Sequence, residues 1–238
     1  PVVRNCYNLL QDDMKNTLRW FLILSLLVLM AVPVHAQSQP VQSRVVVLSF
    51  DGPLTTVWEG YLQRGINQAQ NLKADLIVIE LNTPGGAIDL MERLVTQIRQ
   101  SPIPVLMYVT PEGAMAGSAG TMLTLAGHLA AMTPGTAIGA ASPVDISGGD
   151  IPLTEETKTK EILKALVRSL TTQRGAEAIA LAEATIDTAK AASADEALRA
   201  GLVDYVAPNL TQLLSMVNGA SVQINGAKVI VNTLSPEI

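Results

Sequence analysis

One serine stands where a nucleophile could meet a substrate. Ser118 is the centre of the tiny-residue segment Ala-Gly-Ser-Ala-Gly (residues 116–120), which follows an expected strand and opens an apolar stretch expected to be helical. The first N–H groups of a helix lack an intrahelical partner and lie at the positive end of its dipole. The amide of Ala119 could therefore stabilise an oxyanion formed during attack by Ser118. A serine that merely caps a tightly packed helix is the alternative interpretation.

A second candidate element is the pair Gly85 and Gly86, in a sharp turn directly after an expected buried strand. Two glycines let the backbone approach a ligand closely and direct N–H groups at it. Such donors stabilise the oxyanion of acyl transfer. By itself a strand followed by two glycines is usually only a turn, so this feature gains weight only beside Ser118.

A nucleophilic serine needs a general base. His128 follows Ser118 by ten residues on a helix expected over residues 116–132, which places it roughly 15 Å away along the helix axis. We therefore expect a structural His128, hydrogen-bonded near the helix end, and no Ser-His-Asp triad. Lysine can act as a base if burial keeps it neutral. The start of the next expected helix carries three lysines, Lys158, Lys160 and Lys164. Composition alone indicates that they form a solvent-exposed helix face.

Alternating strands and helices predict an α/β fold with right-handed crossovers. Strands are expected at residues 44–50, 76–81, 105–109, 137–139 and 202–206. Helices are expected at residues 55–72, 88–100, 116–132, 155–173, 176–184, 193–200 and 210–217. Asn225-Gly226 between two apolar runs predicts a type I′ hairpin, as an edge appendage or the start of a linker.

The N-terminal region predicts export. Residues 1–13 precede the first methionine, Met14, and look like upstream translation. Residues 14–36 combine basic residues, an apolar run and a small-x-small end, as in a secretory signal peptide. The run of about 13 apolar residues is short for a membrane span, which needs roughly 20; an uncleaved anchor is the alternative. Residues 37–43 are expected to form a flexible leader.

Composition excludes some functions. The net charge is -5 and no basic stripe is present, so nucleic acid is not an expected partner. The single cysteine, Cys6, precedes the signal peptide, so no disulfide is expected after export. Aromatic residues make up only 3% of the chain and hydrophobic residues 48%. The core must therefore consist mainly of Ala, Leu, Val and Ile.

From about residue 44 to residue 217, the sequence resembles the N-terminal protease domain of the NfeD family. These are membrane-associated ClpP-class serine proteases, encoded beside stomatin-like proteins. The resemblance rests on four segments, residues 81–86, 117–121, 128–140 and 193–204. It implies a ClpP/crotonase-like spiral of β-β-α units over residues 44–218, followed by a hairpin or linker over residues 219–238.

The resemblance also implies a Ser-Lys dyad. Val-Arg-Ser-Leu at residues 167–170 matches a family segment, and counting back from it without a gap gives Lys158 as the base. A shift of one turn would give Lys160 or Lys164. ClpP itself places a histidine after the strand that follows the nucleophile helix. The similar stretch here, residues 140–143, has none, which supports lysine.

The implied function is a serine endopeptidase that cleaves hydrophobic segments, such as those of a stomatin-like membrane protein. Ser118 and Lys158 would be catalytic, and the amides of Gly85, Gly86 and Ala119 would form the oxyanion hole. The resemblance implies a homodimer or larger homo-oligomer at an extracytoplasmic, membrane-associated location, and we expect no cofactor or metal. One alternative is a crotonase-type acyl-CoA enzyme, against which the signal peptide argues. The other is a non-catalytic peptide-binding module.

Overall fold

The computed structural model describes residues 42–144 and 152–238, which belong to one compact unit, Gln42–Ile238. The expected signal peptide, the thirteen residues before it, residues 37–41 of the expected flexible leader and residues 145–151 lie outside the described residues. None of the helices in the described part is long and apolar enough to cross a membrane.

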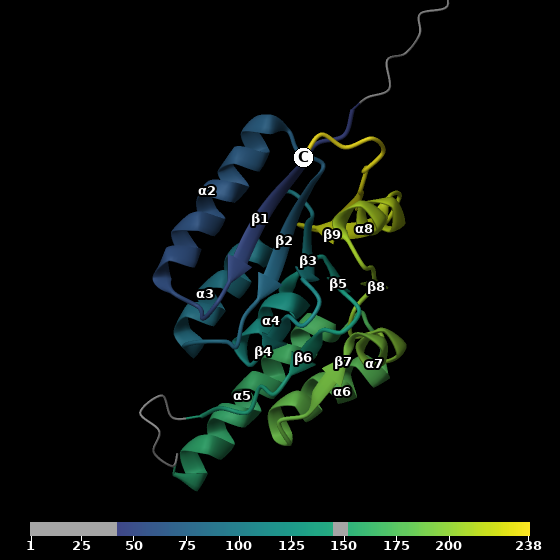
Figure 1. The fold of residues 1–238 in the computed structure, drawn as a ribbon. Coiled ribbons are helices and arrows are strands. Elements are labelled where there is room, and N and C mark those ends of the chain that lie inside the picture. The colour runs from purple at the N-terminus through teal and green to yellow at the C-terminus, as the bar shows by residue number, and fades with distance from the viewer. Residues whose placement is uncertain (1–41, 145–151) are drawn as a thin grey trace, which may run out of the picture. The chain divides into compact units, whose positions relative to one another are not determined.

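A five-stranded parallel sheet forms the centre of the unit (Figure 1). Its order is β1-β2-β3-β5-β8. The strands are β1 (Val45–Asp51), β2 (Leu76–Asn82), β3 (Val105–Val109), β5 (Leu129–Met132) and β8 (Tyr205–Val206). All residues of β3 and β5 are buried, because a parallel sheet is covered on both faces and its inner strands are continuously apolar.

A smaller sheet lies beside the carboxyl ends of β2 and β3. It contains β4 (Met115–Gly117), β6 (Ala137–Gly139) and β7 (Ala191–Ser193). β4 pairs with β6 in parallel and β6 with β7 antiparallel, and a bridge between Thr83 and Ala116 joins β4 to the end of β2. β3 is thus followed by β4 and β5 by β6 before the next helix begins, and the end of β2 reaches the second layer through Thr83, which gives the expected spiral of β-β-α units.

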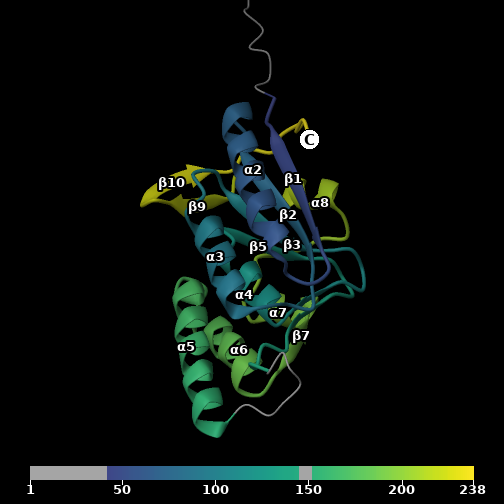
Figure 2. The same ribbon diagram turned by 90° about the vertical axis from the view of Figure 1, so that its left-hand side faces the viewer.

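Helices cover both faces of the main sheet (Figure 2). The helices are α2 (Thr56–Leu72), α3 (Ile88–Arg99), α4 (Ala119–Ala126), α5 (Leu153–Thr171), α6 (Ala176–Asp187), α7 (Ala194–Arg199) and α8 (Leu210–Val217). The larger apolar core packs α2, α3 and α4 against one face, and a smaller core packs α8 and the C-terminal hairpin against the other.

The expected helix over residues 116–132 is wrong at both ends. It begins only at Ala119 and ends at Ala126, and Leu129–Met132 joins the main sheet as β5. Gly127 makes the turn possible, because a Cβ there would lie 2.6 Å from the carbonyl oxygen of Leu129. A short apolar run fits a buried strand as well as a buried helix, so periodicity could not place this boundary.

Smaller differences concern single elements. The expected strand over residues 202–206 is reduced to Tyr205–Val206. The turn expected at Asn225-Gly226 is confirmed, since both residues have positive φ (50° and 80°), as type I′ requires. Its strands, β9 (Ser221–Ile224) and β10 (Ala227–Ile230), pack into the smaller core, where Val222 and Ile224 are buried.

Candidate active site

Ser118 occupies the sharp turn between β4 and α4. Its φ is 50° and its ψ is -120°, a conformation that residues other than glycine rarely adopt. Hydrogen bonds hold it there, from the Ser118 amide to the carbonyl of Gly139 (2.9 Å) and from the Gly117 amide to that of Thr83 (2.9 Å). The Ser118 side chain makes no capping hydrogen bond. A plain helix-capping role therefore does not explain this serine, and such over-determined strain is typical of functional sites.

The glycines around Ser118 allow two backbone segments to touch. Gly85 has a φ of 113°, and a Cβ there would lie 2.7 Å from the Cβ of Ser118 and 3.1 Å from the Ala119 nitrogen. A Cβ at Gly120 would lie 2.6 Å from the side chain of Thr83. The turn after β2 thus packs directly on the nucleophile turn.

The three expected oxyanion donors differ in whether their amides already have a hydrogen-bond partner. The amide of Gly85 donates to Thr83 Oγ1 at 3.0 Å, so it is already engaged. Across residues 42–144 and 152–238, no hydrogen-bond acceptor is found for the amides of Gly86 and Ala119, and both residues line the same groove as Ser118. Gly86 and Ala119 are therefore the donors that the geometry favours, while Gly85 supplies the close approach.

Ser118 faces a groove of about 830 Å³. Its walls come from the turn and start of α3, from α4, from residues 140–144 and from α5. The larger apolar side chains of its lining include Ile88, Met91, Met122 and Leu163. The groove is large enough for several residues of an extended peptide and is mainly apolar, in keeping with the expected hydrophobic substrate.

Two buried threonines stabilise this turn, one from each of the segments 81–86 and 117–121. Thr83 is fully buried, pairs with Ala116 and accepts the Gly85 amide. Thr121 donates its hydroxyl to the carbonyls of Ala116 (3.0 Å) and Gly139 (3.2 Å). Only their tertiary partners identify them as supports of the site.

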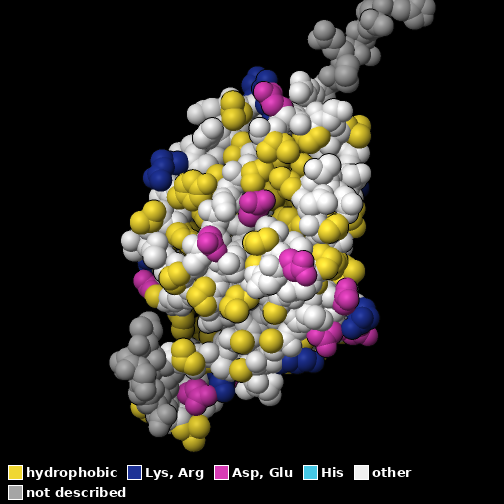
Figure 3. All heavy atoms as spheres, in the orientation of Figure 1, with side chains coloured by type: hydrophobic (Ala, Val, Ile, Leu, Met, Phe, Trp, Pro, Cys, Tyr) yellow, Lys and Arg dark blue, Asp and Glu magenta, His cyan; other side chains and the backbone are white. Residues whose placement is uncertain are grey.

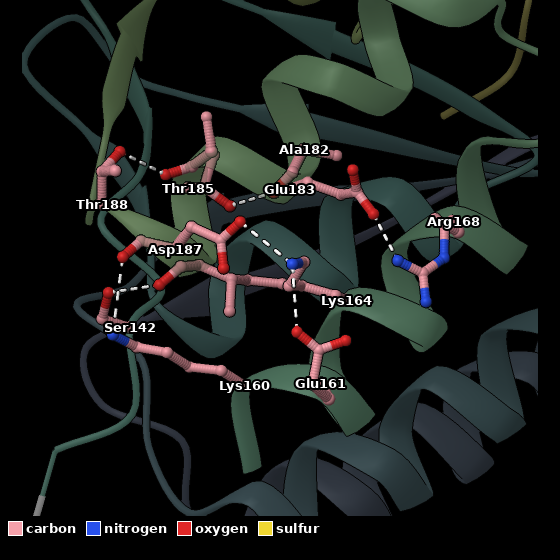
Figure 4. Close-up of polar contacts among 12 residues, drawn as sticks. Ser142, Lys160, Glu161, Lys164, Arg168, Ala182, Glu183, Thr185, Asp187 and Thr188 are labelled. Carbon is pink, nitrogen blue, oxygen red and sulfur yellow. Dashed lines mark hydrogen bonds and ion pairs between the residues drawn. The ribbon is translucent and has the colours of Figure 1, made fainter. Parts of the chain in front are cut away.

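The three candidate lysines lie on α5, and none is among the described residues that line the groove. Lys160 Nζ lies 2.7 Å from Glu156 Oε1. Lys164 Nζ lies 3.1 Å from both Asp187 Oδ2 and Glu161 Oε1 (Figure 4). The hydrogen bonds that Lys164 donates to these two carboxylates, of which the one to Asp187 has the larger effect, raise the pKa of Lys164. Lys164 is consequently held in its protonated form, which is unsuitable for a base.

Lys158 forms no ion pair with a described residue, and its side chain is exposed. The burial expected for a neutral base is therefore not present in this arrangement. The physical reason is its position near the start of α5, where the described neighbours leave the helix open to solvent. α5 instead reaches the groove through Leu163, which is 3% exposed.

His128 has the expected structural role, although not on a helix. It lies in the turn between α4 and β5, and its Nδ1 accepts the amide of Val105 at 3.1 Å. Burial, with a contribution from the charge of Arg99, lowers the pKa of His128 to about 4. His128 is not a groove-lining residue, so a Ser-His pair is absent from the described part of the site.

A family model described as NfeD1b, N-terminal domain, matches residues 44–227. The chain belongs to the NfeD1b family. Membrane-bound protease PH1510 of Pyrococcus horikoshii is 35% identical over 223 residues, covering 92% of this chain and 49% of that protein. Membrane protein NfeD1b of Bacillus subtilis is 27% identical over 215 residues, covering 85% of this chain and 47% of that protein. The chain thus spans about half the length of these relatives.

Solved structures place this NfeD1b domain in the ClpP-like fold. One is the 1510-N membrane-bound stomatin-specific protease, a lysine-to-alanine variant in complex with a substrate peptide. It has a TM-score of 0.76 and 35% identity, covering 83% of this chain and 91% of that one. ClpP1 from Listeria monocytogenes has a TM-score of 0.55 and 20% identity, covering 71% and 94%; this likeness concerns the fold alone. The expected family and fold are confirmed.

Proposed function

We propose that this NfeD1b domain is a serine endopeptidase with Ser118 as nucleophile, Lys158 as general base and the amides of Gly86 and Ala119 as oxyanion hole. The observation that carries the proposal is the strained turn at Ser118, flanked by these two amides. A helix-capping serine requires neither the positive φ of Ser118 nor a free amide from Gly86 beside it. A nucleophile needs both exposure and nearby donors.

The reaction is acyl transfer. Neutral lysine accepts the hydroxyl proton as Ser118 Oγ attacks the scissile carbonyl, and the C=O electrons move onto the oxygen held by the Gly86 and Ala119 amides. Collapse of this intermediate releases the amine, which takes the proton from the lysine, and leaves an ester on Ser118. Water then hydrolyses the ester with the lysine again acting as base. Loss of one oxyanion donor costs roughly 3 kcal/mol of barrier.

Two contacts favour Lys158 over its neighbours, and the spacing in a relative excludes Lys164. Lys164 is kept protonated and Lys160 is ion-paired. In the 1510-N protease, the variants that were solved replace a serine and a lysine 41 residues apart. Here Lys158 follows Ser118 by 40 residues and Lys160 by 42, so spacing alone leaves these two. Catalysis through Lys158 requires the start of α5 to move toward Ser118 when substrate binds, since catalytic hydrogen bonds often form only in the complex.

The groove and the relatives both support the proposed substrate class. The groove is walled by Met, Ile and Leu side chains, which suit an apolar segment. The similar 1510-N protease is described as membrane-bound and stomatin-specific. By extension, this domain would cleave a hydrophobic segment of a stomatin-like protein, as a homodimer or larger homo-oligomer, at the extracytoplasmic side of a membrane.

The test is cleavage of apolar peptides by the purified chain and by Ser118→Ala, Lys158→Ala and Lys160→Ala variants. We expect loss of cleavage in the serine variant and in Lys158→Ala, with Lys160→Ala retaining most activity. Loss in Lys160→Ala with activity kept in Lys158→Ala would transfer the role of base to Lys160. Undiminished cleavage by Ser118→Ala would overturn the mechanism.

The exposed position of Lys158 favours one second candidate, a peptide-binding module without catalysis. Such a module would keep the groove and the amides but never form the dyad. Calorimetric binding of peptides that are not cleaved under any condition would support it. Binding of acyl-CoA, which we do not expect, would instead support a crotonase-type activity.

A further inference from the structure

The last turn of α6 connects the groove wall to α5. The final carbonyls of a helix have no intrahelical partner, and here three consecutive ones are satisfied by other elements. The Thr185 carbonyl accepts the amide of Ala141 (2.7 Å) and the Ile186 carbonyl accepts the hydroxyl of Ser142. Both donors belong to the groove wall beside Ser118.

The third carbonyl, of Asp187, accepts from Lys160 Nζ at 3.4 Å, and the Asp187 carboxylate binds Lys164 Nζ at 3.1 Å. Figure 4 shows both lysines extending from α5 toward this turn. Cations are favoured there because the helix dipole places partial negative charge at a C-terminus. The α6 C-terminal turn, residues 185–187, is therefore in contact with the groove wall on one side and with α5 on the other.

The half of α5 that bears Lys158 lacks apolar anchors. The buried residues of this helix are Leu163, Val167 and Thr171, so the first of them comes five residues, or about 7.5 Å, after Lys158. Among described residues, the polar contacts that join α5 to the α6 C-terminal turn come from Lys160 and Lys164. Figure 2 shows α5 and α6 side by side, apart from the main sheet.

We propose that Asp187 is a positioning residue, whose ion pair with Lys164 fixes α5 relative to the groove wall and thereby sets the approach of Lys158 to Ser118. This inference rests on the proposed Ser-Lys function. Asp187 touches neither substrate nor nucleophile, and it acts through the orientation of α5. Its removal should slow the chemical step and leave peptide binding in the groove intact.

The chain contains a matched control for Asp187. Arg168 and Glu183 form a second ion pair between the same two helices, one turn further from the α6 C-terminal turn. Glu183→Gln breaks that pair and leaves the contacts of residues 185–187 in place. Asp187→Asn removes the charge with almost no change in shape, and Asp187→Glu keeps it.

The experiment measures kcat and KM for an apolar peptide with the full chain and these three variants. We expect Asp187→Asn to lower kcat about tenfold or more with KM within about twofold, since small misplacement of a catalytic group is costly. Asp187→Glu should recover most of the rate and Glu183→Gln should match wild type. Thermal unfolding should show similar small shifts for Asp187→Asn and Glu183→Gln.

The inference is wrong if Asp187→Asn loses no more activity than Glu183→Gln, or if its loss lies wholly in KM. It is also wrong if Asp187→Glu is as slow as Asp187→Asn. Ser118→Ala in the same series keeps the two proposals apart. Activity that survives Ser118→Ala refutes the proposed function, whereas activity that depends on Ser118 but not on Asp187 refutes only the positioning role.

Discussion

Replacing Gly85 by alanine should damage the site much more than a comparable glycine replacement elsewhere. Gly85 has a φ of 113°, and its missing Cβ is what allows Ser118 to lie against it. The new methyl group would lie 2.7 Å from the Ser118 Cβ and 3.1 Å from the Ala119 nitrogen. Neither neighbour can avoid it without moving the nucleophile or an oxyanion donor.

The expected loss of unfolding free energy in Gly85→Ala has two parts. An alanine held at this positive φ costs roughly 1–3 kcal/mol of unfolding free energy, and the overlap adds about 1–3 kcal/mol. Gly52→Ala isolates the first part, because Gly52 has a φ of 91° and a Cβ there would meet nothing within 4 Å. The free energies of unfolding of the two variants should therefore differ by about 1–3 kcal/mol, the overlap alone.

The assay is urea unfolding of both variants together with peptide-cleavage kinetics. Displacing the nucleophile or a donor by about 1 Å can cost roughly 100-fold in rate, so kcat/KM of Gly85→Ala should fall by about this factor. Gly52→Ala should keep activity close to wild type. Equal stability and equal activity in the two variants would refute the view that close contact between the turn after β2 and Ser118 builds the site.

Three further predictions concern single side chains. His128 has a pKa of about 4 in the folded protein against roughly 6.5 unfolded, so the unfolded chain binds the extra proton between these values. The unfolding free energy should thus fall by up to about 3 kcal/mol as pH drops from 6.5 to 4, and urea titrations of His128→Gln should show a flatter pH profile. Asn209 Oδ1 accepts the amide of Gln212 at the start of α8, so Asn209→Ala should cost about 1 kcal/mol by the same titration; no change would mean that water replaces the cap. Leu163→Ala should cost about 2–5 kcal/mol and widen the groove, so a peptide library should shift toward bulkier apolar residues, and an unchanged preference would show that Leu163 does not bound the substrate.

The sequence by itself was sufficient to predict most of the helices, strands and turns of the fold. The continuous apolar runs of β2 and β3 and the apolar spacing of α3 predicted those elements closely. The hairpin turn at Asn225-Gly226 was also predicted correctly, and the helix expected from residue 193 begins with a capping box formed by Ser193 and Glu196. These signals are local, because turn and cap residues act on a few neighbouring backbone groups whatever the rest of the chain does.

Periodicity failed where burial was complete. Residues 129–132 are as apolar as α4 before them. They form a strand because they pair with β3 in the main sheet. On α2, Val57 is 70% exposed while the neighbouring Trp58 is buried. Which of two adjacent apolar residues faces the core depends on the partner surface, which no spacing rule contains.

For the site, sequence identified the nucleophile candidate and both glycine-rich segments, because tiny residues beside a serine are a local pattern. Tertiary structure decided their roles. Thr83 engages the Gly85 amide and leaves that of Gly86 available, and carboxylates on α5 and α6 hold Lys164 protonated. The contacts of the α6 C-terminal turn with α5 on one side and with the groove wall on the other likewise join residues far apart in the chain. Such roles depend on distances between elements, and those distances arise only when the core packs.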